Sequence, residues 1–507
     1  MIAGLLALRA SETPDKVFIV TPEGDYSFSR IDLAARRLAA RLASMGVGEG
    51  DHVALIADNC AAFIVAWFGI SYRGAVAVTL NNQLVADGLR YSLDQCDAKL
   101  LIADLAWVDA RAQHLDARQA AMPRIVIGSD ADFFAGLDGL EPAEPAHVGA
   151  ERPCSILYTS GTTGLPKGVV NCHNAYVAAG EATARALHIT AADRIMVYLP
   201  LFHVNPQMYG VMSALVTGAA IILLKRFSAA TFFDDAIRHG ATGCTFVGTV
   251  LSILVGRHTA ERRDHNMRFC FGGGAPREVW KTVESRYGIK VHEAYGMTEI
   301  GGWSSANTVD DSRFGSCGKP RADLEIRIFD KDDKEAAPGQ QGEIVVRPRV
   351  PDVILLGYYK KPEQMLEASR NLWFHTGDLG SLDADGYLFY HGRLKELIRR
   401  SGEMISPVEI ETCLRRMPSV RDCAVVAVPD AIVGDEIKAV LVCEGPVEPA
   451  AVRAFLKDLL PAYMLPRYVE FLDAIPKTET EKIQRNKLQY LNDSVHDLSA
   501  RRDKAGA

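Results

Sequence analysis

The densest group of potential anion-binding residues lies between Tyr158 and Gly168, directly after the apolar run 154–157. Its small, hydroxyl-bearing and basic members are Thr159, Ser160, Gly161, Thr162, Thr163, Gly164 and Lys167. Backbone N–H groups, hydroxyls and an ammonium in one loop can wrap a polyphosphate, although a polar surface turn has the same composition. The loop is not a Walker A motif, because Lys167 is followed by Gly168 and not by Ser or Thr.

Two further glycine-containing segments follow apolar runs. Gly272–Pro276 follows residues 268–271 and opens a predicted helix. It is not a dinucleotide fingerprint, because Arg277 stands where a third glycine is needed. Tyr295–Glu299 ends in a carboxylate, and a glutamate beside a phosphate site can hold Mg²⁺, which takes few carboxylates plus phosphate oxygens. An isolated Glu299 also fits a solvated surface charge.

The remaining candidate groups lie in the carboxy-terminal part. Asp378 follows Thr376 and Gly377 in a predicted turn. A buried carboxylate there can accept hydrogen bonds from two ribose hydroxyls, whereas a turn aspartate can also bond to its own backbone. Arg393 follows within Gly392–Glu396, and Lys482 lies near the end of the chain, where an ordinary lysine is solvated.

Composition limits the protein classes that fit. The 507 residues include 56 basic and 63 acidic side chains, a net charge of −7, which argues against a general nucleic-acid binder. The apolar run 61–70 is far shorter than the ~20 residues of a spanning helix, so no integral membrane segment is expected. Ten scattered cysteines without a C-x-x-C pair favour a reducing cytoplasm over a disulfide framework or zinc site.

The elements that must position these groups change character along the chain. Through roughly residue 300, short β-rich runs alternate with helix-period stretches such as Ile31–Met45, which predicts an α/β fold with buried, mostly parallel strands. The predicted strands cover 53–57, 75–80, 100–103, 125–127, 196–199 and 221–224. From about Gly315, strands joined by polar turns predict a β-rich subdomain.

A separate small α+β domain is predicted from residue 392, so we divide the chain into 1–391 and 392–507. Ser406–Glu409 has the pattern of a helix start, with a hydroxyl N-cap, proline at the first position and glutamate three residues after the cap. Strands at 424–428, 438–442 and 468–472 and a helix at 450–460 complete the prediction.

Taken together and in order, these motifs resemble the adenylate-forming superfamily, which includes acyl-CoA synthetases, adenylation domains of peptide synthetases and firefly luciferase. The resemblance covers nearly the whole chain. It implies that the loop Thr159–Lys167 holds the phosphates of ATP and that Lys482 supplies the adenylation ammonium. The other implied nucleotide-binding residues are Gly273, Gly274, Ala275, Pro276, Tyr295, Gly296, Met297, Thr298, Asp378 and Arg393. Glu299 is the implied Mg²⁺ ligand, and Thr298 a phosphate contact.

The resemblance also implies a thiol site, a hinge and an acyl pocket. Gly402 and Glu403 would line the path of the pantetheine arm of CoA, and Lys395 would be the hinge of the small domain. The implied acyl pocket consists of His203, Val204, Gln207, Gly248, Gly301 and Trp303. Similar enzymes place an aromatic residue or histidine at His203, beside the reacting acid, but a core histidine fits equally well. Plain core packing also explains Trp303.

One residue departs from the commonest family pattern. Glu481 stands immediately before Lys482, where most relatives have glycine. A carboxylate there can alter the loop backbone or partly neutralise the lysine. A narrower activity, thioester formation from a supplied acyl-AMP, is therefore one alternative.

The resemblance predicts an AMP-forming acyl-CoA ligase that uses ATP, Mg²⁺ and CoA. A carboxylic acid would be activated as acyl-AMP and then transferred to the CoA thiol. Because one small domain carries both Lys482 and the Gly402 loop, domain alternation about Lys395 is expected between the two steps. The sequence does not specify the acid. Among the relatives, the chain as a whole most resembles the carnitine- and crotonobetaine-CoA ligase branch.

Three other interpretations remain open at this point. A stand-alone adenylating enzyme could load a carrier protein, but the absence of an attached carrier domain favours free CoA. A luciferase-like oxygenase or an inert relative is disfavoured because the nucleotide motifs and Lys482 are all present.

Dimers are common among such enzymes, so a homodimer is one arrangement that the resemblance allows.

Overall fold

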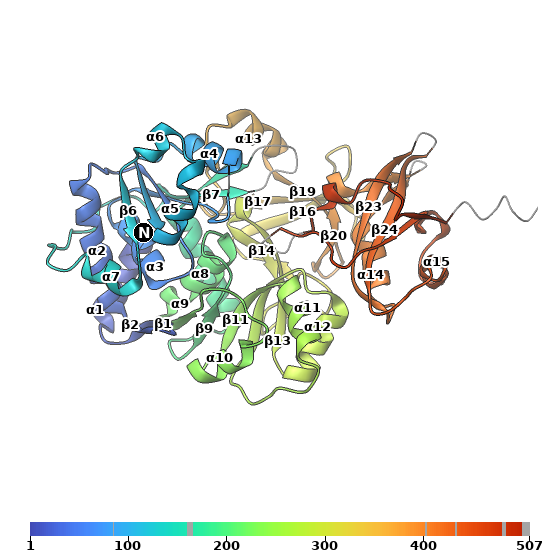
Figure 1. Cartoon of the computed structure of the whole chain (residues 1–507), viewed down its shortest axis with the longest axis horizontal. Helices are drawn as coiled ribbons and strands as arrows, with labels where there is room; N and C mark the ends of the chain where they lie inside the picture. Colours follow the sequence, from blue (N-terminus) through green and yellow to red (C-terminus); the bar gives the residue numbers. More distant parts are fainter. Residues whose placement is uncertain (85, 160–165, 401–402, 431–432, 479–482, 499–507) are drawn as a thin grey trace, which may run out of the picture. The chain divides into compact units, whose positions relative to one another are not determined.

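The computed structural model describes the chain except for residues 85, 160–165, 401–402, 431–432, 479–482 and 499–507 (Figure 1). The chain divides into two compact units. The first comprises Met1–Ile326, Val345–His375 and Gly386–Leu388, and the second comprises Arg327–Ile344, Thr376–Asp385 and Phe389–Ala507. The predicted α/β class, with a large first part and a smaller carboxy-terminal part, is confirmed. The exact boundary at residue 392 stays a prediction.

A nine-stranded sheet in the first unit carries the glycine motifs. Its strands, in spatial order, are β15 (Lys319–Pro320), β14 (Gly302–Ala306), β13 (Lys290–Met297), β12 (Phe269–Gly273), β11 (Gly243–Val247), β9 (Arg194–Val197), β10 (Ala220–Leu223), β1 (Val17–Thr21) and β2 (Gly24–Ser27). The strands from β13 to β1 are parallel, and β14, β15 and β2 are antiparallel additions. The carboxyl ends of β11, β12 and β13 therefore meet at one edge, where open α/β sheets bind ligands.

A seven-stranded sheet in the same unit carries the hydroxyl-rich loop. Its strands are β18 (Gly357–Tyr358), β8 (Lys167–Cys172), β7 (Pro153–Thr159), β4 (Val76–Thr79), β3 (His52–Ile56), β5 (Leu100–Asp104) and β6 (Arg124–Ile127). The strands from β7 to β6 are parallel, whereas β7–β8 and β8–β18 pair antiparallel. All six predicted strands of the first 300 residues are present in the two sheets.

The helices of the first unit bury the apolar stripes that the sequence shows. They are α1 (Ile2–Glu12), α2 (Phe28–Ser44), α3 (Ala61–Tyr72), α4 (Ala86–Gln95), α5 (Leu105–Arg111), α6 (Ala117–Ala120), α7 (Asp130–Ala135), α8 (His173–Leu187), α9 (Met212–Thr217), α10 (Phe232–His239), α11 (Gly248–Arg257), α12 (Arg277–Thr282) and α13 (Pro362–Ala368). α3 is apolar all round and every one of its residues is buried, as expected of a core helix. α2 begins before the predicted Ile31 because the Ser27 hydroxyl caps it by accepting from the Arg30 N–H.

Two smaller sheets follow along the chain. A four-stranded sheet has the order β16 (Leu324–Phe329), β17 (Gly342–Pro348), β19 (Phe374–Leu382) and β20 (Leu388–Arg393). The six-stranded sheet of the second unit contains β21 (Ile398–Arg400), β22 (Glu403–Ile405), β23 (Val420–Asp430), β24 (Gly434–Cys443), β25 (Tyr468–Phe471) and β26 (His496–Asp497). It packs with α14 (Pro407–Leu414) and α15 (Pro449–Lys457), which confirms the predicted small α+β part.

The predicted start of α14 is right in position but wrong in one hydrogen bond. Pro407 opens the helix and Ser406 precedes it, as predicted. The Ser406 hydroxyl does not cap the helix; it donates instead to the backbone carbonyl of His391. A nearby carbonyl therefore replaces the expected backbone N–H as the partner of this side chain.

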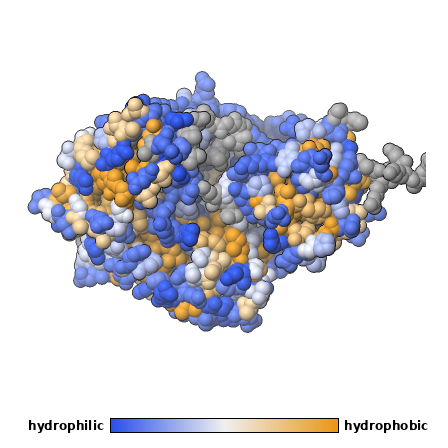
Figure 2. Space-filling view, in the orientation of Figure 1, coloured by the Kyte–Doolittle hydropathy of each residue, from blue (hydrophilic) through white to orange (hydrophobic). Residues whose placement is uncertain are grey.

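The helices and the surface bear on the expectation that the chain has no membrane-spanning segment. Among the described residues, no helix is both long enough and apolar enough to cross a lipid bilayer. Figure 2 shows polar side chains interspersed with apolar ones on the face drawn.

Candidate active site

The hydroxyl-rich loop connects two paired strands. Thr159 ends β7, Lys167 begins β8, and the two residues face each other in the antiparallel register. The intervening predicted residues Ser160, Gly161, Thr162, Thr163 and Gly164 lie outside the described residues. The Lys167 ammonium lies 4.8 Å from the centre of the Tyr358 ring, a cation–π contact at the base of the loop.

Glu299 joins this loop to the other sheet. It lies in the short 3₁₀ turn η4 (Thr298–Ile300), which directly follows β13, and its side chain is buried. Its Oε1 accepts hydrogen bonds from the Tyr358 hydroxyl at 3.2 Å and the Thr159 hydroxyl at 3.4 Å. Burial and the Glu299 carboxylate raise the pKa of Tyr358, so the phenol stays protonated and donates. Thr159, Lys167 and Glu299 are therefore brought together around Tyr358, which sequence reasoning missed.

The Gly273–Pro276 loop is held by a carboxylate that sequence reasoning also missed. Gly273 ends β12, Gly274 has a φ of +87°, and Pro276 precedes α12. Glu293 accepts from the Gly274 N–H at 2.5 Å and from the Ala275 N–H at 3.1 Å. Burial raises the pKa of Glu293 to about 8, although both N–H groups act in the opposite direction. The sequence of β13 mixes polar and apolar residues, so an acidic side chain there gave little signal.

Gly248 lies against this loop. It is the first residue of α11, directly after β11. A Cβ at Gly248 would lie 1.7 Å from the carbonyl oxygen of Gly274 and 2.3 Å from its carbonyl carbon. The loops after β11 and β12 are therefore in direct backbone contact, and glycine is required for that approach. Gly248 was predicted for the acyl pocket; the structure places it beside the predicted adenine loop.

The Tyr295–Met297 segment is the end of β13 and is backed by β14. Gly296 pairs with Trp303, and Met297 pairs with Gly302. A Cβ at Gly296 would lie 2.2 Å from the Gly302 carbonyl oxygen. The two strand backbones are therefore too close to leave room for a side chain at Gly296. The Tyr295 side chain is buried. The predicted adenine and acyl segments are thus one packed unit.

A buried arginine holds the Gly301–Trp303 turn. Nη1 of Arg321 donates to the Gly301 and Trp303 carbonyl oxygens, each at 3.0 Å. The Trp303 indole N–H donates to the Thr183 hydroxyl at 2.9 Å, and the side chain is 3% exposed. Trp303 is therefore a fixed, fully hydrogen-bonded wall, and Arg321 is a second residue whose role the sequence did not reveal.

His203, Val204 and Gln207 lie together at a π-helical turn, η2 (Asn205–Val211), and such turns are frequent at functional sites. His203 and Val204 are partly buried, and the His203 ring packs on Phe202 at 4.4 Å. Gln207 is fully buried; its Nε2 donates to the Leu201 carbonyl and its Oε1 accepts from the Tyr176 hydroxyl, both at 2.5 Å. Gln207 thus stabilises the turn through protein partners, and its predicted contact with an acid stays a prediction.

The second unit holds the predicted ribose ligand and the hinge. Asp378 is 3% exposed, and Arg393 Nε lies 3.1 Å from its Oδ1. The Thr376 hydroxyl accepts from the Asp378 N–H at 3.1 Å and fixes the turn. Lys395 is exposed in a 3₁₀ turn, η6 (Leu394–Glu396), two residues after Arg393.

The segment that flanks Lys482 is anchored at both ends. Lys482 and Gly402 lie outside the described residues, and of Glu403 only the backbone is described, in β22. Lys477 pairs with Ile483 in an isolated β-bridge. The partly buried Arg485 donates to Glu396 at 3.0 Å, to the carboxylate of Glu411 and to the Val425 carbonyl at 2.7 Å.

Comparison with known proteins agrees with this arrangement. Residues 6–359 match the AMP-binding enzyme family, and residues 409–482 match the AMP-binding enzyme C-terminal domain. The sulfoacetate–CoA ligase of Cupriavidus necator is 34% identical over 96% of this chain and 97% of its own length.

Solved structures extend the agreement to the fold. The anthranilate CoA ligase AuaEII in complex with anthranoyl-AMP superposes with a TM-score of 0.88 at 26% identity, covering 96% of each chain. ATP-bound MatB from Rhodopseudomonas palustris gives a TM-score of 0.89 at 26% identity, covering 96% of this chain and 98% of its own. The predicted resemblance is confirmed, and the chain belongs to the AMP-binding enzyme family.

Proposed function

We propose that the chain is an ATP-dependent acid–CoA ligase, which joins a carboxylic acid to coenzyme A through an acyl-adenylate. The observation that carries this proposal is the contact between Thr159 and Glu299, which come from two motifs 140 residues apart. It places a carboxylate at the base of a loop that is rich in anion-binding donors. Membership of the AMP-binding enzyme family and the CoA-ligase relatives support the same enzyme class.

In the first step, an oxygen of the substrate carboxylate attacks the α-phosphorus of ATP. The bond from that phosphorus to the bridging oxygen breaks, and pyrophosphate leaves. Two anions must approach each other, so preorganised cations and donors lower the barrier. We assign the donors to the loop Thr159–Lys167 and the bridging ammonium to Lys482. Thr298 would contribute a phosphate contact, and His203 would lie beside the acid.

Glu299 and Thr159 fit a Mg²⁺ ion. Their oxygens lie 3.4 Å apart beside the predicted phosphate loop, and Mg²⁺ prefers oxygen ligands from one or two carboxylates and from phosphates. When bound, the ion neutralises phosphate charge. The Tyr358 hydroxyl would keep the carboxylate oriented whether or not the site is filled.

Groups from several motifs would hold the nucleoside. The adenine would lie between the Gly273–Pro276 loop and Tyr295, and Glu293 fixes that loop through two backbone N–H groups. The ribose hydroxyls would donate to Asp378. Arg393 orients that carboxylate through the 3.1 Å contact, which leaves it preorganised before the nucleotide arrives.

In the second step, the CoA sulfur attacks the carbonyl carbon of the acyl-adenylate and AMP leaves. The pantetheine arm would pass Gly402 and Glu403. We place the change between steps at Lys395 and take residues 392–507 as the carboxy-terminal domain, of which the part after Lys395 would move. Each side of Lys395 is fixed by its own ion pair, Arg393–Asp378 before it and Glu396–Arg485 after it. A rotation confined to the 394–395 backbone would keep both pairs.

The setting of the reaction follows from simpler features. All ten cysteines are free, which supports a reducing cytoplasm. We take the acid to bind beside the fixed Gly301–Trp303 wall, with free CoA rather than a carrier protein as acceptor. A homodimer is an arrangement to be tested by light scattering.

The experiment that tests this function is a screen of carboxylic acids by pyrophosphate release, with and without CoA. A responding acid should also drive ATP–pyrophosphate exchange. Lys482→Ala should abolish exchange, whereas Lys487→Ala, at an exposed position in the same segment, should not. Acyl-CoA formation without any added protein separates this function from carrier loading. Exchange unchanged in Lys482→Ala would remove that lysine from the first step.

The exchange assay also tests the narrower activity that Glu481 suggests, which is thioester formation from a supplied acyl-AMP. If the carboxylate beside Lys482 suppresses adenylation, the wild-type chain will convert synthetic acyl-AMP and CoA to acyl-CoA but show no exchange. Glu481→Gly would then restore exchange. Exchange in the wild-type chain would exclude this alternative.

A further inference from the structure

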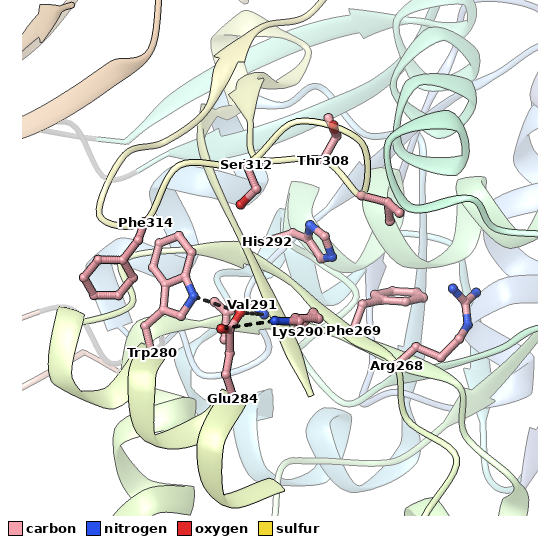
Figure 3. A pocket seen from close by; sticks show the side chains of 11 residues that line it. Arg268, Phe269, Trp280, Glu284, Lys290, Val291, His292, Thr308, Ser312 and Phe314 are labelled. Carbon is pink, nitrogen blue, oxygen red and sulfur yellow. Dashed lines mark hydrogen bonds and ion pairs between the residues drawn. The ribbon is translucent and has the colours of Figure 1, made fainter. Parts of the chain in front are cut away.

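A cavity of about 570 Å³ lies at the amino-terminal edge of β12 and β13 (Figure 3). Phe269 begins β12, Lys290 begins β13, and both line the cavity. The candidate active site lies at the other ends of these strands, beyond Gly273 and Met297. With about 3.3 Å of rise per residue, the length of β13 separates the two places by roughly 20 Å. The cavity is therefore a different place on the same sheet.

The inner walls of the cavity are aromatic. Trp280 from α12 is 3% exposed and Phe269 is 2% exposed, so both are part of the packed core. Phe314 packs edge-on against Trp280, with ring centres 5.2 Å apart, and closes one side. Phe314 and Val309 are 44% and 45% exposed, which leaves apolar surface at the mouth. A volume within 300–1,000 Å³ is typical of small-molecule sites, and the walls here combine aromatic with polar side chains.

Two cations lie at the rim above carboxylates that are more deeply buried. Arg268 pairs with Asp193 at 2.7 Å, and their side chains are 44% and 6% exposed. Lys290 pairs with Glu284 at 3.5 Å, with 70% and 30% exposure. Glu284 is also occupied by the Trp280 indole N–H and a backbone N–H, both at 3.2 Å. A guanidinium has five N–H groups and an ammonium three, so both cations keep donors that face solvent.

His292 supplies a buried polar atom at the centre of the cavity. Its side chain is 6% exposed, and its Nδ1 makes no hydrogen bond to any residue that the structure describes. Figure 3 shows the imidazole between the 308–312 segment and the start of β13, directed into the space that the other residues surround. A buried nitrogen without a hydrogen-bond partner is unfavourable, and a bound polar group would supply that partner.

We propose that this cavity is an accessory binding site for a small aromatic carboxylate. The ring would lie against Trp280, Phe269 and Phe314, and the carboxylate would accept from the Lys290 ammonium at the rim. A polar substituent on the ring would reach His292. Such a site does not depend on the ligase activity proposed for the other edge of the sheet, so either can fail without the other.

The test uses the full chain labelled with 5-fluorotryptophan and titrated with 4-hydroxybenzoate. The chain contains 5 tryptophans, and Trp280 lines the cavity while Trp303 lies in the candidate acyl region. Single Trp→Phe variants assign the two ¹⁹F signals. We expect the Trp280 signal to shift in a saturable way. Binding confined to the acyl region would shift the Trp303 signal alone and would overturn the proposal.

Two charge-reversal variants complete the test. Lys290→Glu should raise the Kd read from the Trp280 signal at least tenfold. Lys331→Glu changes net charge equally at an 88% exposed side chain and should leave the Kd unchanged. His292→Phe should weaken 4-hydroxybenzoate more than benzoate, because only the former has a hydroxyl for Nδ1. If Lys290→Glu and Lys331→Glu titrate alike, the carboxylate does not meet Lys290 and the proposal is wrong.

Discussion

Replacing Gly248 by alanine tests whether the contact between the α11 and α12 loops positions the nucleotide. The added Cβ would lie 1.7 Å from the Gly274 carbonyl oxygen, whereas ordinary contact begins at 3.4 Å. The two loops must therefore separate by about 1.7 Å. Gly274 cannot move alone, because Glu293 holds its N–H at 2.5 Å. A displacement of 1 Å in a positioning element can cost about 10²-fold in rate, so we expect at least that loss.

The assay is ATP–pyrophosphate exchange with an acid found by the screen. Gly256→Ala is the matched control, since Gly256 lies in the same helix and a Cβ added there would meet nothing within 4 Å. That variant should keep wild-type exchange and gain about 0.5–1 kcal/mol of stability, because alanine has the higher helix propensity. Thermal unfolding of both variants separates a local displacement from a general loss of structure.

The decisive comparison is between two folded variants. Gly248→Ala should remain folded. Its slower exchange should appear as a higher KM for ATP or as a lower kcat. Exchange within threefold of Gly256→Ala would show that the nucleotide does not depend on this loop contact. The assignment of Gly273–Pro276 to adenine would then have to be withdrawn.

Three further predictions concern residues that the structure revealed. Because the folded chain holds a proton on Glu293 up to a pKa of about 8, against 4.5 ordinarily, the free energy of unfolding should fall between pH 4.5 and 8. Glu293→Gln should lack that fall in denaturant titrations at several pH values. Arg485→Met removes one of the two cations beside the buried Glu411, which keeps Arg415 at 3.7 Å, and should cost about 1–3 kcal/mol in the same titrations. Tyr358→Phe removes a hydrogen bond to the Glu299 carboxylate and should reduce exchange about tenfold, with an unchanged melting temperature; full exchange would contradict that role.

The elements and the motif residues could be predicted because their signals are local. Short apolar runs between turn residues locate β3, β9 and β10 to within two residues at either end. Glycine, hydroxyl and basic residues directly after such strands mark the ligand-binding edge. Likewise, the enzyme class was predictable from motifs in a fixed order, and the CoA-ligase relatives agree with it.

The residues that sequence reasoning missed act through distant partners. Tyr358 meets Glu299 across 59 residues, and Arg485 meets Glu396 across 89. Neither position is unusual in composition or spacing, so only the fold assigns a partner. Gln207 shows the reverse case. The sequence places this polar residue in a predicted pocket, whereas only the fold shows that the nitrogen and the oxygen of its amide already bond to Leu201 and Tyr176; its contact with an acid stays a prediction.

Three acidic side chains, two in the first unit and one in the second, share a physical feature that explains how one fold can hold a polyanion. Glu293 accepts two backbone N–H groups, Glu299 two hydroxyls, and Asp378 lies beside the Arg393 guanidinium. Each carboxyl group is thus oriented by the protein before any ligand binds, which lowers the reorganisation needed when the nucleotide and its metal arrive. A carboxylate left mobile near phosphates would repel them. Fixed in these directions, the carboxylates of Glu299 and Asp378 can bind a metal ion or accept from a ribose, and Glu293, whose pKa is raised to about 8, can hold a loop without adding a full charge beside the phosphates.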